Sequence, residues 1–320
     1  MIMRISSAAV DLVASVELHA HKPSNLVRSE IGDAEIDVEA TIASLEHSGA
    51  VIKSPFLDAF RLGFTPYTVG FQIVEDFVAD KYVPLVVRAE QVAWLRRHCA
   101  AGEFSMGVIG ASLADVIELF DDLLIGFRRT VIRRYFLVVE SYLFFGHKEL
   151  TAAPIERVPL RASATHRIAE LDDLDRRVVA ALIPRRHFDP ASVGHELRIT
   201  PQQLEARIER LRRLEVIGGF TYRFEPAAVR RRRFGVFVRR RTTDLRMKRR
   251  FIEFSEIHRY VCAVVNFLGE WDHELIVDVP SEHDVVRFVG ELRRAFHGEI
   301  GRVWWYEQAE ELKSTNLFGV

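Results

Sequence analysis

The chain has 320 residues, of which 48% are hydrophobic, and a formal net charge of −1. This length and apolar content suffice for a sizeable buried core and for two or more domains. No apolar run approaches the roughly 20 residues needed to span a bilayer, so we expect no membrane partner and a cytoplasmic location. Cys99 and Cys262 are the only cysteines, which excludes a disulfide framework and Cys-x-x-Cys zinc sites. The 12 histidines show no metal-ligand spacing, so neither a metal nor a cofactor is predicted.

The charge is unevenly distributed along the chain. Residues 1–160 contain 15 Lys and Arg against 21 Asp and Glu, whereas residues 161–320 contain 29 against 24. A polyanion would therefore be attracted to the second half and weakly repelled by the first half.

Several segments of the first half recur in the second half. Residues 38–53 (VEATIASLEHSGAVIK) match residues 204–219 (LEARIERLRRLEVIGG), with Glu, Ala, Ile and Leu identical at four matching positions. Gly102-Glu103-Phe104 likewise recurs as Gly269-Glu270-Trp271. The offset stays between 166 and 169 residues, which predicts two diverged copies of one unit joined in tandem.

The second copy is predicted to begin after a linker over residues 151–164, which holds two prolines and no sustained periodicity. Residues 170–183 carry leucines and valines at helical spacing and acidic residues in the first turn, which indicates a helix. A second, shorter helix is expected over residues 190–197, with Asp189 as its N-cap and Pro190 at its first position.

A third helix has the strongest start signal, because Thr200, Pro201 and Gln203 together form a capping-box sequence. Leu204, Ile208 and Leu211 make an apolar stripe, which leaves Gln203, Arg207 and Arg210 on a polar, basic face. Residues 216–220 end this helix and lead into a short extended stretch, TYRF (221–224), that suits a wing hairpin. Three helices, a basic third helix and a wing favour a winged helix-turn-helix over a helical hairpin with a solvated charged face.

The remainder of the chain has the rhythm of a βαββαβ unit. We expect strands over 234–240, 261–267, 273–279 and 300–308, and helices over 246–257 and 282–296. This order predicts a four-stranded antiparallel sheet with two helices on one face.

At these motifs the second copy resembles the Lrp/AsnC family of transcription regulators. The resemblance rests on residues 171–182 (LDDLDRRVVAAL), residues 199–220 and the loop Gly-Glu-Trp-Asp at 269–272. It implies a winged helix-turn-helix domain, a ferredoxin-like ligand-sensing domain, and pairing of the sensing sheets. It also implies that a small-molecule effector such as an amino acid binds near Gly269, Trp271 and Asp272.

The predicted fold is therefore α+β, with two winged helix-turn-helix domains and two ferredoxin-like βαββαβ sensing domains in tandem. The predicted boundaries are 1–60 (a degenerate winged helix), 61–150 (first sensing domain), 165–228 (second winged helix) and 229–320 (second sensing domain). The predicted function is a sequence-specific transcription regulator without enzymatic activity, acting as a homodimer on double-stranded DNA. The expected DNA contacts are Thr200, Gln202, Gln203, Arg207, Arg210 and Arg213.

The first copy departs from this pattern on its polar face. At the 166-residue offset, Gln203, Arg207 and Arg210 correspond to Asp37, Thr41 and Ser44. Phosphate-binding chemistry is lost there, so the first winged helix is expected to be structural or to contact a partner protein. A run with 11 Arg and Lys at 229–250 could track the DNA backbone beside the third helix, or bind RNA or an acidic partner.

Two other functions stay open. Some proteins that resemble this family in tandem or paired form decarboxylate sirohaem-type tetrapyrroles, and His258-Arg259-Tyr260 is the candidate cluster for such chemistry. The other alternative is a protein-interaction module that never touches DNA.

Overall fold

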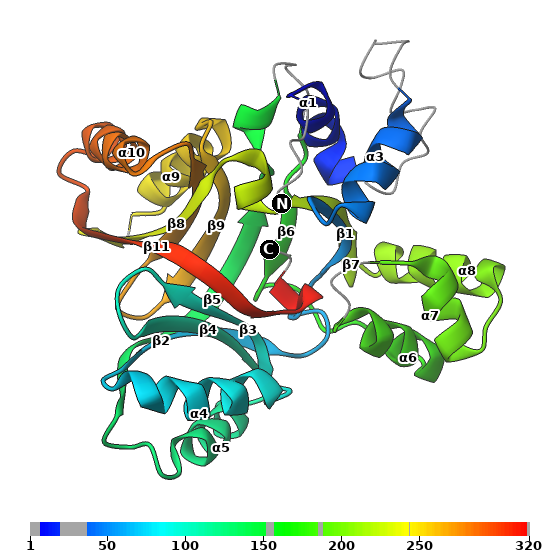
Figure 1. The fold of residues 1–320 in the computed structure, drawn as a ribbon, viewed down its shortest axis with the longest axis horizontal. Helices are drawn as coiled ribbons and strands as arrows, with labels where there is room; N and C mark the ends of the chain where they lie inside the picture. Colours follow the sequence, from blue (N-terminus) through cyan, green and yellow to red (C-terminus); the bar gives the residue numbers. More distant parts are fainter. Residues whose placement is uncertain (1–6, 20–36, 152–156, 185–187, 243, 319–320) are drawn as a thin grey trace.

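The structure, a computed structural model, describes residues 7–19, 37–151, 157–184, 188–242 and 244–318 (Figure 1). Residues 1–6 and 20–36 of the predicted first winged helix thus lie outside the described residues. The fold is mixed α+β. Within the described ranges, no helix has the length and apolar character needed to cross a membrane.

One four-stranded antiparallel sheet comes from the first half of the chain, in the order β5-β2-β4-β3. Helices α4 and α5 connect its strands and cover one face, where Val69, Tyr82 and Val116 belong to one apolar core. Ser112 and Asp115 form a capping box that begins α5. The elements are β2 (Thr65–Ile73), α4 (Asp76–Arg88), β3 (Val92–His98), β4 (Glu103–Gly110), α5 (Leu113–Leu124) and β5 (Val131–Phe144).

A second antiparallel sheet comes from the second half, in the order β11-β8-β10-β9. The six elements predicted between residues 234 and 308 are all present, with the last strand longer than expected. Helices α9 and α10 cover this sheet around Phe251 and Phe288. The elements are β8 (Arg232–Arg240), α9 (Leu245–Ile257), β9 (Val261–Leu268), β10 (His273–Val279), α10 (Glu282–Ala295) and β11 (Ile300–Ser314).

The two sheets close into one barrel because their edge strands pair within the chain. Strand β3 pairs antiparallel with β11, and the second part of β5 pairs antiparallel with β9. The helices lie outside this barrel (Figure 1). Since side chains alternate along each strand, the other face of both sheets turns inward and supplies an aromatic-rich core that includes Tyr135, Phe237 and Tyr306.

The remaining helices form a lobe beside the barrel with its own apolar core (Figure 1). The predicted caps are confirmed: Asp189 caps α7, and Thr200 and Gln203 form a capping box on α8. The elements are α1 (Ser7–Val16), η1 (Glu17–His19), α3 (Val38–His47), β1 (Val51–Leu57), α6 (Asp173–Leu182), α7 (Pro190–Leu197), α8 (Pro201–Arg213) and β7 (Ile217–Phe224).

Two local predictions are wrong. Residues 217–224 do not fold back as a wing hairpin, because β7 pairs antiparallel with β1 of the first half, from Val51 opposite Phe224 onward. Residues 152–156 of the predicted linker lie outside the described residues, and its later part contains strand β6 (Leu160–Ser163), which adds to the end of β5. Both errors have one cause: the pairing partners lie more than 15 residues away, where local sequence patterns carry no information. Short 3-10 helices complete the connections: η2 (Lys148–Leu150), η3 (Pro226–Val229) and η4 (Asn316–Phe318).

Candidate functional site

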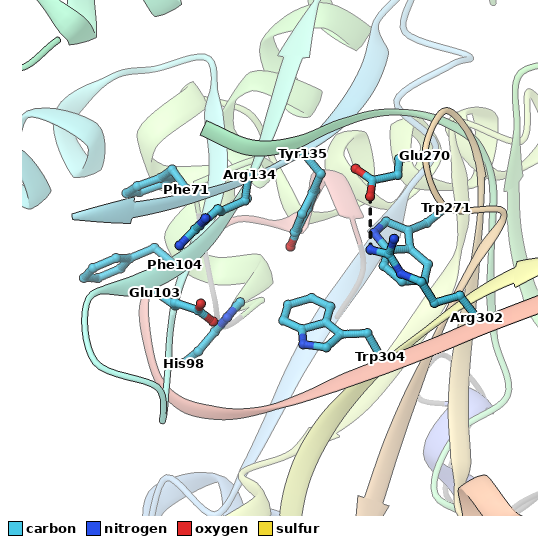
Figure 2. A pocket seen from close by; sticks show the side chains of 11 residues that line it. Phe71, His98, Glu103, Phe104, Arg134, Tyr135, Glu270, Trp271, Arg302 and Trp304 are labelled. Carbon is cyan, nitrogen blue, oxygen red and sulfur yellow. Dashed lines mark hydrogen bonds and ion pairs between the residues drawn. The ribbon is translucent and has the colours of Figure 1, made fainter. Parts of the chain in front are cut away.

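A cavity of about 370 Å³ opens at one mouth of the barrel, where both halves of the chain meet (Figure 2). The first half contributes the ends of β2 and β3 and the starts of β4 and β5, and the second half contributes the β9–β10 loop and the start of β11. Its volume lies within the usual range for ligand pockets, roughly 300 to 1,000 Å³. The lining residues are Gly70, Phe71, His98, Glu103, Phe104, Arg134, Tyr135, Glu270, Trp271, Arg302 and Trp304.

Two glycines allow tyrosine rings to lie flat across the barrel wall. Gly70 is opposite Tyr135 on β5, and Gly235 is opposite Tyr306 on β11. A Cβ atom at Gly70 would come within 2.2 Å of the Tyr135 ring, and one at Gly235 within 2.4 Å of the Tyr306 ring. Any larger residue at either position would therefore displace a tyrosine.

The cavity lies toward the first half because aromatic rings fill the interior of the second half. Phe237 stacks on Trp304 with ring centroids 5.5 Å apart, and it also contacts Trp271 at 5.6 Å. Trp271 and Trp304 remain in the cavity wall. Trp304 is partly exposed and offers a flat apolar surface suited to a planar, conjugated ligand, whereas Trp271 is buried.

The cavity contains one hydroxyl suited to donating a proton. Burial, reinforced by the neighbouring Tyr306 and Glu274, raises the pKa of Tyr135 well above its usual value, so the hydroxyl keeps its proton. Its oxygen has no hydrogen-bond partner of normal geometry among the described residues, although Ser105 lies near it. Figure 2 shows this oxygen pointing into the cavity.

His98 lies beside that hydroxyl as a neutral ring. Burial, with Arg96 as a smaller cause, lowers the pKa of His98 to about 3. Its Nε2 lies 3.0 Å from Ser105 Oγ, and its ring stacks on Tyr306 with centroids 3.8 Å apart. The ring is thus held in place by contacts on two sides.

Two arginines stand at the mouth of the cavity. Arg302 is 4.5 Å from the Trp271 ring centroid and pairs with Glu270 at 3.1 Å, and both side chains of that ion pair are about half exposed or more. Arg134 is exposed and bonds only to the neutral amide of Gln72 among its recorded contacts. Guanidinium groups at such positions bind carboxylates through paired hydrogen bonds.

The structure places one of the three predicted effector residues in this cavity. Trp271 lines it and is only 3% exposed. Asp272 instead accepts hydrogen bonds from the backbone and side chain of Arg240, and Gly269 packs its backbone against Leu137. The predicted loop borders this cavity, but the sequence did not point to His98, Arg134, Tyr135 and Arg302, because only the cross-strand register brings them together.

The predicted DNA-contacting residues are on α8, but two of its arginines contact the protein itself. Arg207 bonds to Asp172 and, at 3.2 Å, to Asp175, while Arg210 bonds to Asp175 at 2.8 Å. Asp175 is fully buried, so these arginines neutralise a carboxylate inside the helical lobe. Thr200 and Gln203 are engaged in the capping box, whereas Gln202 and Arg213 are exposed.

The cluster His258-Arg259-Tyr260 lies just before β9, at the barrel end remote from the cavity. His258 Nε2 is 3.0 Å from Glu291 of α10, and Tyr260 belongs to the core beneath the helices. The three residues therefore have no place in the candidate site.

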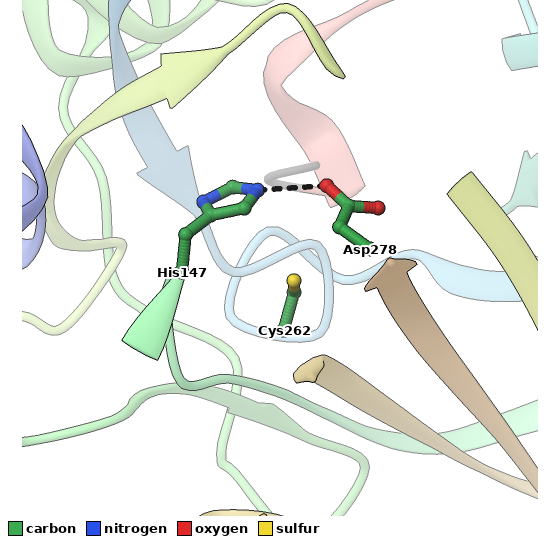
Figure 3. Close-up of side chains that lie close together, drawn as sticks. All are labelled: His147, Cys262 and Asp278. Atoms are coloured by element: carbon green, nitrogen blue, oxygen red, sulfur yellow. Dashed lines mark hydrogen bonds and ion pairs between the residues drawn. The ribbon is translucent and has the colours of Figure 1, made fainter. Parts of the chain in front are cut away.

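A second group of chemically versatile residues is buried at the barrel end opposite the mouth. His147, Cys262 and Asp278 could each offer one atom to a metal ion (Figure 3). However, His147 bridges Glu17 at 2.6 Å and Asp278 at 2.9 Å, and Arg233 binds both oxygens of Asp278 at 2.8 Å. The guanidinium already supplies the positive charge that Asp278 needs, so this is an ion-pair network tying η1 to the barrel.

No protein-family model matches the chain, and no curated protein matches it in sequence. Among solved structures, that of the siroheme decarboxylase NirDL superimposes with a TM-score of 0.59 over 96% of this chain and 92% of its own, at 11% identity. The same enzyme in complex with an iron-uroporphyrin III analogue gives 0.58 over the same shares at the same identity. An AsnC family transcriptional regulator from Agrobacterium tumefaciens covers 45% of this chain and 94% of its own, at 21% identity and a TM-score of 0.39.

At 11% identity, the likeness to NirDL shows a shared fold across the chain. It also corrects one expectation. We expected a protein without enzymatic activity, and that exclusion is wrong, because a solved structure that superimposes over 96% of the chain is that of an enzyme.

The buried state of His98 predicts a specific pH dependence. An unfolded chain would protonate this histidine near pH 6.5, whereas the folded protein does so only near pH 3. The unfolded state therefore binds more protons below pH 6.5, and the folded state is favoured less as the pH falls toward 3. His98→Gln keeps a donor toward Ser105 and removes this titration. The free energy of unfolding, measured in urea, should fall between pH 7.5 and pH 4.5 by about 2 to 3 kcal/mol less in the variant than in the wild type. Equal decreases in both proteins would refute the lowered pKa of His98.

The buried ion-pair network predicts a large loss of stability when Asp278 is neutralised. Asp278→Asn leaves Arg233 and His147 without their shared carboxylate, which should lower the free energy of unfolding by about 3 kcal/mol. Asp173→Asn is the control, because Asp173 forms an exposed pair with Arg176 and should cost about 0.5 kcal/mol or less. Similar urea midpoints for the two variants would contradict this role of the network.

Proposed function

We propose that this protein binds a tetrapyrrole carrying carboxylate arms and removes CO₂ from an arm held in the mouth cavity. One observation carries the proposal: a single cavity combines a protonated tyrosine hydroxyl, two arginines and tryptophan walls. The fold shared with NirDL agrees with it but, at 11% identity, is not its basis.

The cavity suits the two chemical parts of such a substrate. A flat conjugated ring gains from contact with the partly exposed Trp304. Carboxylate arms gain from Arg134 and Arg302, and an arm that reaches Arg302 would replace Glu270 as its partner. The cavity accommodates one edge of the macrocycle, and the remainder would lie at the open mouth.

The proposed reaction consumes one proton for each CO₂ released. The bond between the carboxylate carbon and the methylene carbon of an acetate arm breaks, CO₂ leaves, and the electron pair stays on the methylene carbon, next to the conjugated ring. Tyr135 donates its proton to that carbon, which becomes a methyl group, and water restores the proton. The tyrosine is fully protonated before the reaction, and the carbanion that forms is a far stronger base than the tyrosine phenolate, so the proton moves to carbon.

Two further features of the chain belong to the proposal. The two β-α-β-β-α-β segments, with Gly70/Tyr135 matched by Gly235/Tyr306, support a tandem duplication with sensing-type units over 61–150 and 229–320. The regions 1–60 and 165–228 would then correspond to two helix-turn-helix units, whose strands β1 and β7 pair with each other.

A DNA-binding regulator is the second candidate. The capping box that begins α8 and the exposed Gln202 and Arg213 favour it. The pairing of Arg207 and Arg210 with Asp175 weakens it, and Glu205 and Glu209 on the same helix are exposed. An amino-acid effector and a homodimer would belong to that candidate.

The test uses iron uroporphyrin III and the full chain. Wild-type protein should change the absorbance spectrum of the porphyrin saturably, and mass spectrometry should show loss of CO₂ from its arms. Arg134→Gln with Arg302→Gln should weaken binding about tenfold or more, because two charged hydrogen-bond partners are lost. Tyr135→Phe should retain binding and slow CO₂ release about 100-fold or more, the usual contribution of a general acid.

Tyr142→Phe is the matched control. It makes the same change on the same strand, at another buried tyrosine whose hydroxyl also has no described hydrogen-bond partner and which does not line the cavity. Its rate should equal that of the wild type. An unchanged porphyrin spectrum, or binding without CO₂ release by the wild type, would contradict the proposed function.

A further inference from the structure

A second, more apolar cavity of about 530 Å³ lies outside the barrel, between α5 and the sheet of the first half. Val69, Tyr82, Leu124 and Phe136 form much of its wall. At its rim, Leu113 and Ile117 are each 52% exposed on successive turns of α5. Large aliphatic side chains at half exposure beside an apolar cavity suggest that a ligand covers them.

The cavity reflects one difference between the two halves of the chain. Phe71 follows Gly70 in the first half, and Val236 follows Gly235 at the matching place in the second half. The residue opposite Phe71 on β5 is Arg133, whereas the residue opposite Val236 on β11 is Trp305. Trp305 packs against the core under α9 and α10. Arg133 is exposed, so the first half has no bulky ring at the matching position and space remains under α5.

Arg133 also defines the chemistry of that space. Its guanidinium lines the rim, its recorded contact is with the Phe136 ring at 5.9 Å, and no carboxylate pairs with it among the described residues. Asp121, the acidic residue of the lining, lies 3.6 Å from Arg128 instead. An apolar cavity with one available cation at its rim is complementary to a molecule with an apolar chain and a single anionic head.

We propose that this cavity binds an amphipathic carboxylic acid, with the hydrocarbon chain under α5 and the carboxylate on Arg133. The site shares only Phe71 with the lining of the mouth cavity and is independent of the proposed decarboxylation. Burying the chain removes apolar surface of both ligand and protein from water, which supplies the main driving force. The ion pair with Arg133 fixes the orientation of the ligand, with its carboxylate at the rim.

The probe is decanoate, titrated calorimetrically into the full chain, with decanol as its uncharged counterpart. Leu124→Trp fills the cavity and should weaken both probes about tenfold or more. Arg133→Gln should weaken decanoate about fivefold while leaving decanol unchanged, because an exposed ion pair contributes about 1 kcal/mol. Ile117→Trp, at the exposed rim, is the alternative filling variant if Leu124→Trp does not fold.

Two controls separate this site from others. Arg129→Gln neutralises a neighbouring exposed arginine outside the cavity lining and should leave decanoate binding unchanged. Arg134→Gln should also leave it unchanged, whereas a loss there would place decanoate in the mouth cavity and overturn the proposal. The proposal is also overturned if decanoate gives no saturable heat with the wild-type protein. If, in addition, Ile117→Glu converts a dimer into a monomer in sedimentation, a second copy of the chain covers this face instead.

Discussion

The closure of the barrel within one chain is the constraint on which the rest of the structure depends. Strand β3 pairs with β11 and β5 pairs with β9, so each half supplies the edge partner that the other half lacks. No edge of either four-stranded sheet is left to pair with another molecule. Because both halves belong to one chain, they are free to differ, whereas two identical subunits would place equivalent residues on both sides of the axis. The two halves can therefore differ in sequence while their edge strands stay paired.

Both candidate sites lie where the two halves of the chain differ. Inside the barrel, Phe237 and Trp304 fill the space of the second half, and the mouth cavity lies beside Gly70 and Tyr135 of the first half. Outside the barrel, Trp305 packs into the core of the second half, while Arg133 leaves a cavity in the first half. The opposite end of the barrel is fixed by the buried carboxylates around His147 and Arg233. A rigid base with an open mouth is an arrangement that suits binding and chemistry at one end.

The sequence predicted what depends on local patterns and missed what depends on register. Helix caps at Asp189 and Thr200 and the strands of the second sheet follow from residues close together in the chain. The pairing of β7 with β1, and the meeting of His98, Tyr135 and Arg302, depend on partners tens to hundreds of residues away. The basic face of α8 shows another limit: helical spacing correctly separates Arg207 and Arg210 from the apolar stripe, but only the fold shows that Asp175 pairs with both.

The most direct test of the central claim is a crystal structure of the full chain with iron uroporphyrin III bound. We expect the macrocycle at the barrel mouth, with its flat face against Trp304, carboxylate arms on Arg134 and Arg302, and one arm within hydrogen-bonding reach of the Tyr135 hydroxyl. A macrocycle bound elsewhere, for example against α8 or under α5, or one at the mouth whose arms all point away from Tyr135, would contradict it.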